Sequence, residues 1–468
     1  MSPSLILILA VVLAYLAARV AFDWLAKRFM LVSGVEYLLL GILLGPRVSG
    51  VLSTETMAGF APLITLALGW IGAIVGTQFY LPALVTIAGA RYRLAFLEAL
   101  GTAFVVAGVE TYLIAWLGGM TVRAALVPAV ALGAIAAVSA PAGIEVATRR
   151  IGAGRREPIV QQLQVATAVD ALVGIVAIGL LFSLFHPPTR SGLRAITPTE
   201  WAVMTFGIGA VGGALFHLFL GDEMDGDRLF ISLAGAIILV TGAAAYLDLS
   251  PVLASMIVGT TLINTSRGRQ KIAETLAQSE RPFYFVLLVF AGASWRPSGV
   301  SWWWAPVVLF LVARVTAKIG TARLAARANG ELPVLGPDWG RALVGQGGLA
   351  LALALDYARF RGGTLPNVVF SAAVASLLLT DLASAHVIHS VMSRLLPGLH
   401  VRGWERRRRA GAAAEGGGGA NGAETAEGAE DGEERIGAAE NTGERAGERA
   451  GAAGKPAAEP LDPPSEER

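Results

Sequence analysis

Asp170 carries a carboxylate in a stretch that is otherwise dominated by apolar residues. The stretch is QVATAVDALVGIV, residues 164–176, and its apolar run begins near Pro158. As a helix, this run would place Asp170 roughly 18 Å from its start, near the centre of a hydrocarbon core about 30 Å thick. A carboxylate at that depth costs on the order of 3 kcal/mol and usually marks a functional site. We interpret Asp170 as an ion or proton carrier. The alternative is a structural residue that pairs with a helix-end amide or a nearby cation.

Arg314 is a second ionisable residue at membrane depth, about twelve residues into its apolar run. Because the guanidinium cannot easily reach water, we expect an internal partner, either an acidic residue or the carbonyls of a broken helix. Lys318 lies one turn nearer the cytoplasmic end, and we interpret it as extending toward the inner interface. Glu98 and Glu110 are interpreted as structural or interfacial residues.

Two apolar runs contain helix breakers at their middle. One carries SAPAG (139–143), in which Pro141 removes a backbone hydrogen bond, and the other carries VGQGG (344–348). Broken helices are tolerated at membrane depth where they line a cavity, and their freed carbonyls can coordinate a cation. Ser139 and Gln346 are therefore candidate ion-binding residues. The alternative is that the small residues only allow close helix packing.

The composition indicates that these residues belong to a membrane protein. Of the 468 residues, 54% are hydrophobic and 15% are charged, and the mean hydropathy is +0.60. The chain has no cysteine, which excludes disulfides and cysteine-ligated metal sites. About 13 apolar runs are candidates for crossing a bilayer, of which the ninth and tenth are short. They lie near residues 4–22, 34–52, 60–81, 94–117, 124–147, 158–185, 200–220, 229–247, 250–264, 282–294, 302–326, 340–358 and 366–392.

The two halves of the chain resemble each other. LLLGILLGP (38–46) aligns with VLASMIVGT (252–260), and VATAVDALV (165–173) aligns with ASLLLTDLA (375–383). An odd number of runs separates matching members, so the second copy is inverted, as in secondary transporters. We predict an all-α polytopic fold with two inverted six-helix repeats and crossed broken helices. Asp381 then occupies the position symmetric to Asp170, which makes it a candidate second titrating group.

The charge distribution predicts orientation and domains. Short loops on one side collect most Lys and Arg, which places the N-terminus outside and the C-terminal tail in the cytoplasm. Residues 1–402 form the predicted transporter domain, and residues 403–468 are rich in Gly, Ala, Glu and Arg, a composition typical of a disordered tail. We expect a multi-pass protein of the cell membrane, with the lipid bilayer as its solvent.

Several segments together resemble the monovalent cation/proton antiporters, including bacterial Na⁺/H⁺ antiporters and potassium efflux systems. The segments are GVEYLLLGILLGPRVSGVL (34–52), SAPAG, Asp170, SPVLASMIVGTTL (250–262), Arg314 in LVARV, and QGG (346–348). The resemblance covers about residues 30–390. It implies a homodimer with a dimerisation domain and a mobile core that exchanges a monovalent cation for protons. The chain differs from the family pattern at Val169, where a polar or acidic residue usually precedes the key carboxylate.

We therefore expect a secondary active antiporter for Na⁺ or K⁺ and protons, with Asp170 as the shared carrier. The alternative is an inverted-repeat transporter for another solute, such as an organic anion. An enzyme is not expected, because the sequence has no H-E-x-x-H or G-x-S-x-G motif. No cofactor and no nucleic-acid partner are expected.

Overall fold

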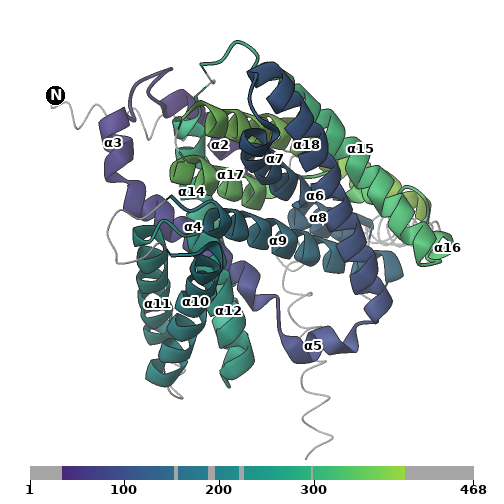
Figure 1. Cartoon of the computed structure of the whole chain (residues 1–468). Helices are drawn as coiled ribbons and strands as arrows, with labels where there is room; N and C mark the ends of the chain where they lie inside the picture. The colour runs from purple at the N-terminus through teal and green to yellow at the C-terminus, as the bar shows by residue number, and fades with distance from the viewer. Residues whose placement is uncertain are drawn as a thin grey trace, which may run out of the picture. The chain divides into compact units, whose positions relative to one another are not determined.

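The computed structural model describes residues 34–151, 157–187, 196–220, 226–296, 299–361 and 363–395. Within these ranges the chain is helical and contains no strand (Figure 1). The predicted run at 4–22 and the predicted tail at 403–468 lie outside the described residues. The ranges belong to one compact unit, Met1–Gly403.

Each of the other predicted runs corresponds to one helix or to one interrupted pair. These are α2 (Val35–Leu44), α4 (Ala61–Thr77), α6 (Gly89–Gly118), α7 and α8 (Val122–Ala137 and Pro141–Ile151), α9 (Pro158–Leu184), α10 (Pro198–Leu220), α11 (Gly226–Tyr246), α12 (Pro251–Thr265), α14 (Glu280–Ser294), α15 (Trp304–Ala328), η1 and α17 (Trp339–Leu343 and Gly347–Arg361) and α18 (Thr364–Leu395). Short connecting helices are α3 (Thr54–Gly59), α5 (Leu81–Thr86), α13 (Arg269–Gln278) and α16 (Leu332–Leu335). The apolar helices identify a polytopic membrane protein.

Helix α2 is shorter than the run at 34–52 predicts. The helix ends at Leu44, Gly45 adopts an extended conformation, and Pro46 follows. Because the residue before a proline is pushed out of the helical region, the chain turns here although its residues stay apolar. Hydropathy therefore overestimates the length of this span.

The repeat appears in the way the helices pack. Helix α6 packs against α7 and α9, and α15 packs in the same way against η1 and α18. Helix α4 contacts α12, and the symmetric pair, α14 and α2, is also in contact. Figure 1 shows α6 beside α15, and α10, α11 and α12 as a neighbouring group. The described helices therefore pack in two similar arrangements, and the first helix of the first predicted repeat lies outside the described residues.

Glycines bring the symmetric helix pairs into very close contact. A Cβ on Gly259 of α12 would lie 2.1 Å from the carbonyl oxygen of Ala73 on α4. A Cβ on Gly292 of α14 would lie 2.1 Å from the carbonyl oxygen of Leu38 on α2. Small residues at such crossings let helix backbones approach, which is how helices pack tightly in lipid.

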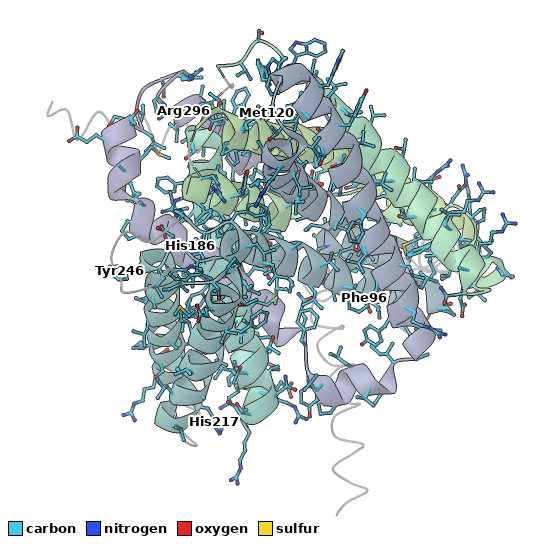
Figure 2. All side chains as sticks on the ribbon, viewed as in Figure 1. Phe96, Met120, His186, His217, Tyr246 and Arg296 are labelled. Carbon is cyan, nitrogen blue, oxygen red and sulfur yellow. The ribbon has the colours of Figure 1, made fainter. Side chains whose placement is uncertain are left out.

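Large apolar side chains cover the outside of the helices. Tyr246 is 88% exposed and Phe104 is 73% exposed. Figure 2 shows side chains such as Phe96 and Tyr246 on the outer side of the bundle. This distribution fits a protein whose outer surface faces lipid, because a bilayer does not penalise exposed apolar groups.

Candidate functional site

Asp170 lies on α9 and is completely buried. Its Oδ2 accepts a hydrogen bond from Nζ of Lys318, at 2.7 Å. Its Oδ1 is buried and has no hydrogen-bond partner among the described residues. Polar groups buried in this way are normally satisfied, so this oxygen is still free to accept a further partner.

Lys318 contacts a second carboxylate as well. Its Nζ lies 3.0 Å from Oε1 of Glu98, and both side chains have no exposed surface. The interpretation of Lys318 as reaching the inner interface is therefore wrong. Position along one helix suggested a route to water, but α15 turns this lysine toward α6 and α9, where two acids compensate its charge. Glu98 is likewise part of the site.

The two helix breaks meet each other. Helix α7 ends at Ala137 and α8 begins at Pro141, while η1 ends at Leu343 and α17 begins at Gly347. The hydroxyl of Ser139 donates to the carbonyl oxygen of Leu343, at 2.9 Å, and the amide of Ala140 donates to the carbonyl oxygen of Gly345, also at 2.9 Å. These bonds join the breaks in the two repeats, as crossed broken helices require.

Arg314 is held by the carbonyls that the breaks expose. Its guanidinium donates to the carbonyl oxygens of Val344 at 2.5 Å, Val138 at 2.9 Å and Gly345 at 3.4 Å. A helix C-terminus presents unpaired carbonyls with partial negative charge, so a buried cation stabilises it. Of the two partners expected for Arg314, the structure shows the broken-helix carbonyls.

Asp381 contacts the second break where α17 begins. Its Oδ1 accepts hydrogen bonds from the backbone amides of Gln346 and Gly347, at 2.8 and 3.3 Å. The carboxylate therefore compensates the positive end of α17. The side-chain amide of Gln346 is buried, and neither its nitrogen nor its oxygen has a partner among the described residues.

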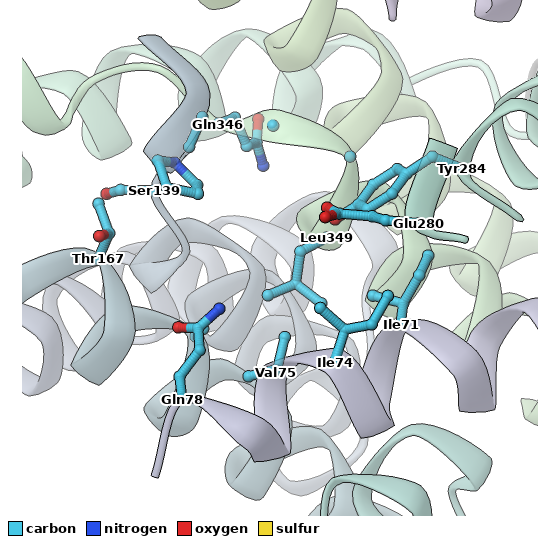
Figure 3. Close-up of a pocket in the computed structure, with 15 residues that line it drawn as sticks. Ile71, Ile74, Val75, Gln78, Ser139, Thr167, Glu280, Tyr284, Gln346 and Leu349 are labelled. Atoms are coloured by element: carbon cyan, nitrogen blue, oxygen red, sulfur yellow. The ribbon is translucent and has the colours of Figure 1, made fainter. Parts of the chain in front are cut away.

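A cavity of about 70 Å³ lies against the breaks. The polar side chains that line it are those of Gln78, Ser139, Thr167, Glu280, Tyr284 and Gln346. Figure 3 shows the Glu280 carboxylate pointing into the cavity, across from Ser139 and Thr167. The volume accommodates several water molecules or a partly hydrated ion.

The cavity stops short of Asp170, which is not among its lining residues. Thr167 and Ala171, on the same helix, do line it, one turn before Asp170 and one residue after it. Glu280 was not among the residues predicted from the sequence. Its position at the start of an apolar run was the only local signal.

The comparison with solved structures identifies the fold. The chain matches the sodium proton antiporter MjNhaP1 from Methanocaldococcus jannaschii with a TM-score of 0.59. The match covers 83% of this chain and 97% of that chain, at 16% sequence identity. The chain has the fold of a sodium/proton antiporter. Comparisons with models of protein families and with curated proteins found no match.

The antiporter fold confirms the predicted fold class and agrees with the resemblance of the motifs. The two helix breaks and the buried Asp170 described above are therefore parts of an antiporter fold. Among the described residues, no group of three or more His, Cys, Asp or Glu side chains could hold a metal ion.

Proposed function

We propose that the chain is a secondary active antiporter that exchanges a monovalent cation for a proton at Asp170. The observation that carries the proposal is the contact of two carboxylates with one ammonium, all without exposed surface. When all three are ionised, Asp170, Glu98 and Lys318 together carry one net negative charge. One proton or one monovalent cation neutralises that charge. Moving the neutralised site through a bilayer costs far less free energy than moving the site with its unpaired charge.

The surrounding groups suit a small cation. The free Oδ1 of Asp170 is a hard oxygen ligand. Thr167, Ser139 and Gln346 bring further hydroxyl and amide oxygens to the lining of the nearby cavity. The net negative charge of Asp170, Glu98 and Lys318 disfavours an organic anion, which was the alternative. We further propose Na⁺ or K⁺ as the cation, a homodimer, and a cytoplasmic opening of the cavity. The last follows from the predicted orientation, which places Glu280 at a cytoplasmic helix end.

Competition between the two ligands tests the proposal. If a proton and a cation occupy Asp170 alternately, lowering the pH should raise the apparent KM for the cation and leave the maximal rate unchanged. Flux into proteoliposomes, measured at several pH values with Na⁺, K⁺ and Li⁺ in turn, gives both constants. If lowering the pH instead reduced the maximal rate and left KM constant, the proton would bind at a site other than Asp170.

A further inference from the structure

The Nζ atom of Lys318 is shared between two carboxylates that come from different helices. It lies 2.7 Å from Oδ2 of Asp170 on α9 and 3.0 Å from Oε1 of Glu98 on α6. The ammonium is therefore already in contact with both acids. If Asp170 loses its negative charge, the ammonium can stay paired with Glu98 without moving to a new position.

Occupation of Asp170 changes the charge balance around Lys318. Once a proton or a cation neutralises Asp170, that carboxylate no longer compensates the ammonium. A buried ammonium without a counter-charge is strongly destabilised, and such a group usually loses its proton instead. With Asp170 as the sole partner, Lys318 would have to release its own proton each time the site is loaded.

Glu98 is positioned to prevent this. The hydroxyl of Thr102 donates to Glu98 Oε1 at 3.1 Å and lies 3.0 Å from the hydroxyl of Thr321, three residues after Lys318 on α15. These contacts fix the carboxylate, while its Oε2 has no partner among the described residues and can accept the ammonium.

Other charged groups around Glu98 leave this pairing intact. Helices α7, α9 and α15 pack against α6. From α9 the charged group is Asp170, and from α15 it is Lys318, with Arg314 close enough to interact electrostatically. Helix α7 has Arg123 as its one charged residue, exposed in its first turn.

We infer that Glu98 is the counter-charge that holds the Lys318 ammonium whenever a proton or a cation occupies Asp170. This role rests on the proposed exchange at Asp170 and makes Glu98 a positioning residue. Lys318 stays charged throughout the cycle, so one cation is exchanged for one proton at Asp170 alone.

A charge-balance series tests the role of Glu98. In Glu98→Gln, binding of a proton or a cation at Asp170 leaves the Lys318 ammonium without a counter-charge. Exchange at pH 7 should therefore fall at least about tenfold. The pH optimum should also move about one unit upward, because Lys318 must then lose its proton. Glu98→Gln/Lys318→Gln restores a single net negative charge, carried by Asp170. We expect its exchange to return to within about threefold of wild type, at the wild-type pH optimum.

Glu110→Gln is the matched control. Glu110 lies on the same helix and is equally buried, and neither of its carboxylate oxygens has a hydrogen-bond partner among the described residues. Its variant should exchange as wild type does.

Two results would overturn the role of Glu98. One is a Glu98→Gln variant with the wild-type rate and pH profile. The other is a double variant that does not recover exchange. If it folds, restoring the charge balance does not restore transport, and if it does not fold, Glu98 is needed for structure. Failure of the proposed function is distinguishable from these two results, because the wild-type protein itself would then exchange none of the tested cations for protons.

Discussion

At the scale of single residues, the structure explains how charged groups persist inside an apolar bundle. Asp170, Glu98 and Lys318 compensate one another, and Arg314 compensates the carbonyls that two broken helices expose. Removing one partner from a buried ionic contact is costly because the other is left uncompensated. The charged residues of this site therefore stabilise one another inside the bundle.

Replacement of Arg314 with Ala should destabilise the protein. Three carbonyl oxygens at the breaks would lose their donor, and we expect a loss of about 3 kcal/mol or more, together with loss of exchange. Arg323→Ala is the control, since Arg323 is an exposed arginine on the same helix. Thermal unfolding in detergent and flux in proteoliposomes measure both effects. Equal stability of the two variants would show that the carbonyls do not depend on Arg314.

At the scale of helices, local sequence signals predicted the interruptions well. Pro141 marks the start of α8, and Gly347 adopts a φ of 71°, which favours glycine at the start of α17. The burial of Asp170 also agrees with its place inside a long apolar run. These features depend on neighbouring residues, so the sequence alone reveals them.

The pairing of Lys318 with Asp170 and Glu98 could not be predicted in that way. Lys318 and Asp170 are 148 positions apart, and their contact depends on how α6, α9 and α15 pack. A long cationic side chain on the cytoplasmic half of a helix often extends to the interface, and the local sequence does not distinguish Lys318 from that case. Glu98 carried no signal beyond being acidic in an apolar run.

The close crossing of α4 and α12 predicts a specific intolerance. In Gly259→Ala the new Cβ would stand 2.1 Å from the Ala73 carbonyl oxygen, so the helices must separate. We expect a loss of about 1–3 kcal/mol of stability. Gly242→Ala on α11 is the control, because a Cβ there meets nothing within 4 Å. Thermal unfolding of both variants in detergent compares them. A stable Gly259→Ala variant would mean that this crossing is looser than described.

At the scale of the whole molecule, two repeats of one helical unit place one break from each copy at a common point. The site therefore forms where the repeats meet, and the polar side chains around it come from both halves of the chain. Transport of a neutralised site between the two membrane faces needs no net movement of charge. The proposed one-for-one exchange should thus be electroneutral.

The C-terminal segment should be dispensable for folding. Residues 403–468 contain few large apolar side chains that could pack against the helices. Truncation after about Gly403 should leave the thermal stability of the detergent-extracted protein nearly unchanged. A large drop in stability would mean that the segment docks on the transporter domain.

The exchange activity of Asp170→Asn in sealed proteoliposomes tests the central claim most directly. Asparagine keeps the size of the side chain but can neither bind a proton nor neutralise a cation, so this variant should fold and show no cation/proton exchange. Wild-type protein, under the same imposed pH gradient, should exchange at a rate that does not change with membrane potential. Cation-dependent proton flux that persists in Asp170→Asn would contradict the assignment of Asp170 as the carrier.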